Sequence, residues 1–225
     1  MKPNAFGSYA SPSYAEGPPR QVPGFASLHR MVSMLLAERV PANGSVLVLG
    51  AGGGLELKAL ADAHAGWSFH GVDPSAAMLG LAQQAVAPHS DRIQLHEGYV
   101  DVAPDGPFDG AVSLLTFHFI PREERLGTLR QLRRRLKPGA PLLLAHISFS
   151  QSEPERSAWI ARHVAWPTAP DADLAQLEAA RQAIGTRLSI IAPEEEEAML
   201  REAGFVGVSL FYAALSFRGW VAYAA

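Results

Sequence analysis

A run of glycines directly follows a short apolar segment and has the spacing of a ligand-binding turn. Residues 46–49 (VLVL) lead into Gly50-Ala51-Gly52-Gly53-Gly54, and helix-forming residues begin at Leu55. Glycines at a strand-to-helix turn let a ligand approach the backbone closely and expose N–H groups at the start of the helix. Three glycines at alternate positions exceed what a tight turn requires. We therefore expect Gly50, Ala51 and Gly52 to contact a ligand.

Three ligand classes compete for such a loop. A phosphate-binding P-loop needs Gly-Lys-Ser or Gly-Lys-Thr, whereas Leu55 and Glu56 follow the last glycine here. A dinucleotide-binding loop would have its third glycine at residue 55, which is Leu. Asp73 ends the next apolar segment, where an acidic side chain can accept hydrogen bonds from both ribose hydroxyls of an adenosine. The alternative for Asp73, which precedes Pro74, is a cap for the helix that begins at Ser75.

Histidine is the residue type best suited to take a proton from a hydroxyl or amine near neutral pH. His118 follows the apolar segment 111–115, and His146 lies near the end of the segment 142–147. Both positions face the edge of a parallel sheet at which ligands bind, so both are candidate catalytic residues. The alternative for each is a structural or substrate-shaping role. No clustered ligand motif predicts a metal.

The elements that must position these residues follow from the hydrophobic pattern. Short unbroken apolar runs predict strands buried on both faces, and stretches of helical period separate them. This alternation predicts a parallel sheet covered by helices on both faces. The expected strands are 46–49, 69–72, 111–115 and 142–147, the expected helices are 28 to about 41, 76–86 and 123–136, and an antiparallel hairpin is expected at 206–211 and 217–223.

Two other regions stand outside this alternation. Residues 1–24 are rich in Gly, Pro, Ser and Tyr and predict an irregular arm, whose Tyr9 and Tyr14 could close over a ligand as a lid. Residues 151–185 predict a helical insertion that covers the site and carries Trp166. The four glutamates after Pro193 fit the first turn of a helix, and we interpret them as capping and solubilising residues.

Composition limits the class of protein. The chain has 225 residues, 48% of them hydrophobic, and a formal net charge of -3, which predicts one globular domain without a basic surface for nucleic acid. Cysteine is absent, which excludes disulfides and thiolate metal sites. No apolar run is long enough to span a bilayer and no signal peptide is recognised, so we expect a cytoplasmic protein.

The order of four segments resembles the class I S-adenosylmethionine-dependent methyltransferases over residues 25–225. These segments are VLVLGAGGG, HGVDPSAAML, FDGAVSLLTFHFI and LRRRLKPGAPLLLAHIS. The resemblance implies a Rossmann-like three-layer α/β sandwich whose mostly parallel, seven-stranded sheet ends in an antiparallel strand. It also implies that the glycine loop faces the methionine part of the cofactor, Asp73 binds ribose and Met78 packs on adenine. Tyr99 and Val100 would lie beside the adenine amine, and Leu114 and Leu115 where substrate and sulfonium meet.

The segments around Val22-Pro23-Gly24-Phe25 and 203–222 are similar to the group that contains carboxy-S-adenosylmethionine synthases. Those synthases have Tyr and Asn where this chain has Phe25 and Leu114, and Arg181 corresponds to an Arg that holds the extra carboxylate. The chain also has Val48 and Tyr99 where the wider family commonly has acidic or amide residues. These departures predict an altered pocket.

The resemblance predicts transfer of a methyl group from S-adenosyl-L-methionine to an unidentified small-molecule acceptor, with S-adenosyl-L-homocysteine as the product. Carboxy-S-adenosylmethionine synthase-like chemistry, a nicotinamide-dependent oxidoreductase and a catalytically silent cofactor-binding domain remain as alternatives. Nucleic acid and membrane partners are not expected, and a homodimer is left open.

Overall fold

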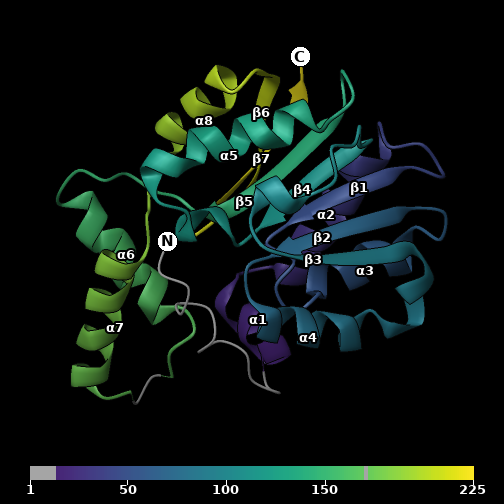
Figure 1. The fold of residues 1–225 in the computed structure, drawn as a ribbon. Helices are drawn as coiled ribbons and strands as arrows, with labels where there is room; N and C mark the ends of the chain where they lie inside the picture. Colours follow the sequence, from purple (N-terminus) through teal and green to yellow (C-terminus); the bar gives the residue numbers. More distant parts are fainter. Residues whose placement is uncertain (1–13, 170–171) are drawn as a thin grey trace.

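A seven-stranded sheet forms the centre of the computed structural model, which describes residues 14–169 and 172–225. Its strand order is β3-β2-β1-β4-β5-β7-β6 (Figure 1). Strands β1 to β5 are parallel, β7 pairs antiparallel with β5, and β6 pairs antiparallel with β7. The strands are β1 Ser45–Leu49, β2 Ser68–Asp73, β3 Ile93–Glu97, β4 Gly110–Leu114, β5 Pro141–Ile147, β6 Phe205–Ala214 and β7 Phe217–Ala224. The predicted Rossmann-like sheet with an antiparallel C-terminal strand is confirmed.

Helices cover both faces of the sheet and complete three layers. On one face α2 (Phe25–Ala37) and α3 (Leu55–Ala63) pack against Val46 and Val48, with α4 (Ala76–Ala85) next to α3. On the other face α5 (Arg122–Arg134) and α8 (Pro193–Glu202) share a second core cluster with Leu47 and Leu49. No helix within 14–169 and 172–225 has the length and apolar character needed to cross a membrane.

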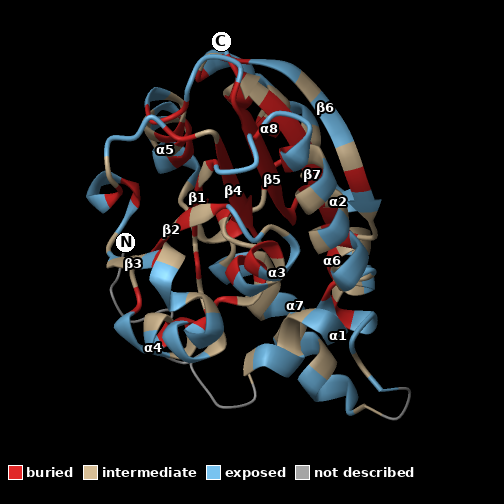
Figure 2. Ribbon diagram, turned by 90° about the vertical axis from the view of Figure 1, so that its right-hand side faces the viewer, coloured by how far each residue is buried: buried red, intermediate tan, exposed pale blue. Residues whose placement is uncertain are grey.

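The central strands are buried along their whole length, which explains their unbroken apolar sequences. Every residue of β4 and β5 is buried, and Figure 2 shows the buried residues concentrated in these strands. A strand covered by helices on both faces has no polar side, so its residues do not alternate in character. The edge strand β3 lacks this signal, because only Ile93 of its five residues is buried, while two are intermediate and two are exposed. Its limits were therefore not predicted.

Two helices occupy the region of the predicted insertion. Helix α6 runs over Glu155–Ala165 and α7 over Leu174–Arg187, two residues beyond the expected limit of 185. They pack on each other and lie apart from the layers that flank the sheet (Figure 1). No residue of α7 is buried, which suits a helix that covers a site and does not build the core.

The N-terminal arm is helical in its described part, which corrects the prediction of an irregular segment for residues 14–21. A 3-10 turn at Tyr14–Glu16 leads into α1 (Gly17–Gln21). Proline is accepted in the first turn of a helix because its missing N–H would have no partner there, and the Val22 N–H closes the helix on Pro18 O. Tyr9 and the rest of 1–13 lie outside the described residues.

Candidate functional site

A cavity of about 540 Å³ opens where the parallel strands end. The arm, the glycine loop, the ends of β2 and β4, and helices α6 and α7 all contribute to its wall. The structure brings together all eleven residues predicted to bind a cofactor, namely Phe25, Gly50, Ala51, Gly52, Asp73, Pro74, Met78, Tyr99, Val100, Leu114 and Leu115. Their contact with a cofactor stays a prediction.

The glycine loop is packed from two sides and could not carry side chains. Gly50 has a φ of +81°, and a Cβ there would come within 1.9 Å of Thr116 Oγ1. A Cβ at Gly53 would lie 2.5 Å from the Tyr14 ring, which covers the loop from the arm. The N–H groups of Gly50 and Ala51 both donate to Val72 O and fix the loop on β2. The glycines thus allow other parts of the protein to approach the loop closely.

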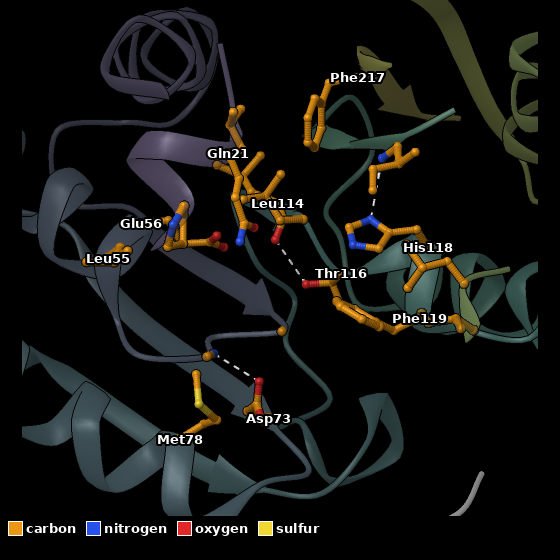
Figure 3. A pocket seen from close by; sticks show the side chains of 18 of the residues that line it. Gln21, Leu55, Glu56, Asp73, Met78, Leu114, Thr116, His118, Phe119 and Phe217 are labelled. Atoms are coloured by element: carbon orange, nitrogen blue, oxygen red, sulfur yellow. Dashed lines mark hydrogen bonds between the residues drawn. The ribbon is translucent and has the colours of Figure 1, made fainter. Parts of the chain in front are cut away.

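The carboxylate of Asp73 connects the glycine loop to the start of α4. Its Oδ2 accepts a hydrogen bond of 2.9 Å from Gly52 N (Figure 3). Its Oδ1 accepts one of the same length from Ser75 N. The cap of α4 is Ser75, whose Oγ accepts from Met78 N. Burial raises the pKa of the Asp73 carboxyl, and the two N–H donors oppose this. Each oxygen keeps a second acceptor position for a ligand hydroxyl.

The chain turns sharply where β4 ends in the cavity. Leu115 has a φ of 58°, a left-handed conformation that is uncommon for a residue with a bulky side chain. Its N–H donates to Ala145 O at 2.6 Å, and Thr116 Oγ1 donates to Leu114 O at 3.0 Å. Strained positions of this kind are found at ligand sites when the surrounding structure holds them.

His118 lines the cavity with a buried ring, but its hydrogen bonding favours a donor over a base. Its Nδ1 accepts a long hydrogen bond of 3.4 Å from Ile147 N (Figure 3). Burial lowers the pKa of His118 well below its usual range, and the nearby charges of His146 and Arg125 add to this effect. A neutral ring whose Nδ1 accepts carries its proton on Nε2, and that N–H can donate to a ligand.

His146 lies on the opposite side of β5 and does not line the cavity, which corrects its prediction as a catalytic residue. Successive side chains of a strand point to opposite faces, and it is Ile147 that lines the cavity. The His146 Nδ1 donates to Ile147 O at 2.9 Å, and its Nε2 lies 3.1 Å from Glu196 Oε2. The histidine belongs to the polar contacts between β5 and α8.

Glu196 corrects the interpretation of the glutamate run as capping and solubilising. Its side chain is fully buried and forms an ion pair of 2.7 Å with the equally buried Arg125 of α5. Glu196 precedes the buried Leu200 by one helical turn, so both lie on the face of α8 that packs inward. Arg125 also donates to Ile120 O and Ser189 O.

The predicted substrate residues separate into two groups. Tyr14 lines the cavity, where burial raises the pKa of its hydroxyl. Trp166 is 51% exposed and Arg181 is paired with Glu178 at 3.5 Å on α7, and neither lines the cavity. A helix presents one face to a site, and on α7 that face consists of Ala180, Ala183 and Ile184. The structure therefore does not place Arg181 for binding a carboxylate in this cavity.

Several cavity residues were not predicted as site residues. Glu56 in the first turn of α3 has a buried Oε1 without a hydrogen-bond partner. His29 lies one helical turn after Phe25, and burial lowers its pKa to about 4. The His163 Nδ1 lies 2.6 Å from Ser216 Oγ, and burial lowers the pKa of this histidine also. The sequence gives no signal for these residues, because only the orientation of each element shows which side chains line the cavity. Gln21 and Thr116 also line the cavity and were not predicted.

The cavity wall is apolar toward α6 and α7 and has no fixed cation. Among the described residues that line it, none is Arg or Lys, whereas Glu56, Asp73 and Glu124 are acidic. No group of three or more His, Asp or Glu in the described part of the chain is arranged to hold a metal ion. The wall therefore suits a ligand with cationic groups at the glycine loop and a second, apolar ligand near the insertion.

Comparison with known proteins agrees with this site. Residues 46–139 match the family described as a methyltransferase domain. The carboxy-S-adenosyl-L-methionine synthase of Chromohalobacter salexigens is 27% identical over 214 residues, which cover 91% of this chain and 77% of that protein. That of Pseudomonas aeruginosa is 26% identical over 212 residues, covering 90% and 86%.

Solved structures share the fold at low sequence identity. The pyocyanin biosynthetic protein PhzM is similar with a TM-score of 0.66 at 19% identity, covering 98% of this chain and 62% of that one. The Haemonchus contortus phosphoethanolamine N-methyltransferase 2 in complex with S-adenosyl-L-methionine has a TM-score of 0.57 at 18% identity, covering 80% and 38%. Residues 46–139 thus match a methyltransferase domain, and the chain shares its fold with these solved structures.

Proposed function

We propose that the chain transfers a methyl group from S-adenosyl-L-methionine to a small, uncharged and largely apolar acceptor. The observation that carries the proposal is the cavity wall, which joins acidic residues at the glycine loop to an apolar chamber and contains no Arg or Lys among the described residues. A sulfonium and an ammonium suit the acidic end. An apolar acceptor suits the other.

The residues of the loop end fit the cofactor. Asp73 has acceptor positions left for the ribose hydroxyls, and Met78 and Val100 offer apolar surface for adenine, with Tyr99 beside it. Gly52 leaves the loop without a side chain at the wall. When bound, S-adenosyl-L-methionine supplies a methyl group that is already activated for in-line displacement. The contribution of the chain is to hold the acceptor in line and to exclude water.

The same wall argues against a carboxylated sulfonium. A carboxylate in a dry pocket requires a fixed cation and hydrogen-bond donors, because an unpaired buried charge is costly. Phe25 and Leu114 are apolar, and Arg181 is paired with Glu178 away from the cavity. The similarity to carboxy-S-adenosyl-L-methionine synthases therefore does not extend to the groups that such a ligand would need.

The acceptor chamber lies between the insertion and the ends of β4 and β5. It is lined by Ile147, Val164, Ile184, Leu188 and Phe217, with His118 and His163 as its polar groups. Burial lowers the pKa of both histidines, so both are neutral near pH 7 and can donate or accept one hydrogen bond each. This favours an acceptor with one or two hydrogen-bonding groups on an apolar body.

Competition calorimetry tests the choice of cofactor. We expect S-adenosyl-L-methionine and S-adenosyl-L-homocysteine to bind about 10²- to 10⁴-fold more tightly than the carboxylated sulfonium, the range for two missing hydrogen bonds to a charged group. NAD should not compete. Tighter binding of the carboxylated form would show that the synthase-like alternative is right.

A labelled-methyl assay with a panel of acceptors tests the reaction. Neutral apolar phenols and amines should be methylated, and carboxylated counterparts of the same size should not. Cofactor binding without transfer to any acceptor of the panel would favour the catalytically silent alternative. The proposal includes the cytoplasm as the location, with which the absence of cysteine is compatible, and a homodimer stays a prediction.

A further inference from the structure

The carboxyl group of Glu56 is buried in the wall of the cavity, and one of its two oxygens has no hydrogen-bond partner among the described residues. Glu56 belongs to the first turn of α3, directly after the glycine loop, and only 8% of the residue is exposed. Its Oε1 is buried and accepts no hydrogen bond within the described part of the chain. Figure 3 shows the carboxyl group pointing into the cavity, toward Leu114.

A role in helix stability alone does not explain this arrangement. A carboxylate in the first turn favours the positive end of the helix dipole, but such residues act well when exposed to water. Burial raises the pKa of the Glu56 carboxyl well above its usual range, and the charge of Asp73 adds to this, while a backbone hydrogen bond at Leu114 opposes it. An unsatisfied buried acid is a cost that the ligand-free protein bears.

The described part of the chain contains no cation that could relieve this cost. No Lys or Arg lines the cavity there, burial keeps His29 neutral near pH 7, and the ionisable groups that interact with Glu56 are the acid Asp73 and the phenol Tyr14. A ligand at the glycine loop that carries a cation or a strong hydrogen-bond donor would supply the partner of this oxygen.

We infer that Glu56 receives the α-ammonium group of the cofactor's methionine part. The inference rests on the proposed cofactor, whose α-ammonium carries three hydrogen-bond donors and one positive charge. A buried carboxylate and this ammonium would complete each other, as a charge-assisted pair shielded from water. Val48 of β1 is apolar and packs in the core, so the buried acid next to the glycine loop comes from Glu56 of the following helix.

The test removes each partner of the pair in turn. Glu56→Gln keeps the shape of the side chain and removes its charge. The ligands are S-adenosyl-L-homocysteine and its deaminated analogue, in which hydrogen replaces the amino group, measured by calorimetry. Glu123→Gln is the matched control, because Glu123 is an exposed glutamate in the first turn of α5 and does not line the cavity.

We expect the wild-type protein to bind the deaminated ligand about 10- to 100-fold more weakly than S-adenosyl-L-homocysteine, the range for a hydrogen bond to a charged group. Glu56→Gln should weaken the binding of S-adenosyl-L-homocysteine by a similar factor and the binding of the deaminated ligand by less than about twofold. Glu123→Gln should change neither affinity. 5′-Methylthioadenosine, which lacks the whole amino-acid part, should bind wild type and Glu56→Gln equally.

Three results would overturn the inference. The first is an equal loss of affinity for both ligands in Glu56→Gln, which would mean that Glu56 shapes the loop. The second is unchanged affinity with reduced turnover, which would make Glu56 a proton acceptor for the substrate. The third is a wild-type protein that does not discriminate between the ligands, which needs no variant and so is independent of folding. Failure of the wild type to bind any adenosyl ligand would instead remove the proposed function itself.

Discussion

Asp73 joins the glycine loop to the start of α4 and also lines the cavity. Its carboxylate accepts hydrogen bonds from Gly52 and Ser75 and so holds the loop against the helix start. The same oxygens face the cavity with acceptor positions unused. A single carboxylate therefore holds the loop, and its binding of ribose stays a prediction.

Replacing Asp73 with Ala should weaken binding of S-adenosyl-L-homocysteine by about 1.5–3 kcal/mol, because each hydrogen bond to a charged acceptor contributes in that range. Calorimetric titration measures the loss. The exposed Asp91 provides the control, and Asp91→Ala should bind as wild type does. Unchanged affinity in Asp73→Ala would restrict Asp73 to holding the loop.

Glu56 should make the ligand-free protein less stable as the pH rises. Its pKa is raised in the folded state by burial and by Asp73, so above the ordinary Glu value of about 4.3 the native state keeps a proton that the unfolded state has released. Stability is then lost with a slope of up to about 1.4 kcal/mol per pH unit until the folded pKa is passed.

Glu56→Gln should remove this slope and raise the unfolding free energy at pH 7 to 8, measured by urea unfolding across the pH range. Asp73 contributes in the same direction because its pKa is also raised, and Tyr14 acts only at higher pH. Histidines with a lowered pKa, among them His29, His118 and His163, make stability rise with pH in wild type and variant alike. The difference in slope between the two proteins therefore measures the contribution of Glu56. A variant that is less stable than wild type at pH 8 would contradict the expectation.

At the level of elements, α5 and α8 are joined by a buried ion pair and not by apolar contacts alone. Arg125 and Glu196 lie 2.7 Å apart with both side chains fully buried, and His146 of β5 contacts the same carboxylate. The sequence could show neither residue as buried. Glu196 stands in a run of four glutamates, and only the rotation of α8 decides which of them faces the sheet.

Removing one partner of this pair should cost stability without touching the cavity. Glu196→Ala should lower the unfolding free energy by about 3–5 kcal/mol, because Arg125 would stay buried and uncompensated. The matched control is Glu202→Ala on the same helix, whose exposed pair with Arg130 should account for less than about 1 kcal/mol. Equal losses of unfolding free energy in the two variants, measured by urea unfolding, would show that the buried pair contributes no more to stability than the exposed pair.

On the scale of the whole molecule, the sequence predicted the parts whose signal is local. The strands β1, β2, β4 and β5 follow from unbroken apolar runs, and the hairpin of β6 and β7 from its β-prone segments. The edge strand β3 was missed because its residues are only partly buried. The helical arm at 14–21 was missed because the composition of residues 1–24, rich in Gly, Pro, Ser and Tyr, predicted irregular structure, although proline also begins helices.

Some residues of the candidate site could likewise be predicted from local sequence signals, and others could not. Residues placed by strand ends and by the glycine loop could be predicted, because the carboxyl ends of parallel strands meet at one edge. His146 could not, since a shift of one residue along a strand exchanges the two faces, and Ile147 takes the cavity face. Arg181 depended on the rotation of α7, which an exposed helix without an apolar stripe does not specify. Trp166 follows the last residue of α6, where its direction depends on how that helix ends.

The arm and the insertion, far apart in the sequence, meet at the mouth of the cavity. Tyr14 lies against Gly53 from one side, and Ile184 and Leu188 line the wall from the other. Neither the turn at Tyr14–Glu16 nor α1 contains a buried residue, so this part of the chain adds little to the core. We predict that it acts as a lid, which orders over the cofactor and excludes water from the reaction.

Two truncations separate the lid from a tail without function. Deleting residues 1–20 removes Tyr14 and Pro18. The deletion should weaken the binding of S-adenosyl-L-homocysteine by about tenfold, equal to about 1.4 kcal/mol of binding free energy, while the unfolding free energy changes little. Deleting residues 1–13 leaves Tyr14 in place and shows whether Tyr9 contributes. In the full chain, hydrogen exchange should slow on cofactor binding in residues 14–24 and in α7 but not in α8, which lies on the far face of the sheet. If the longer deletion leaves both cofactor affinity and turnover unchanged, the arm is not a lid. If the deletion unfolds the protein, the arm supports the structure instead.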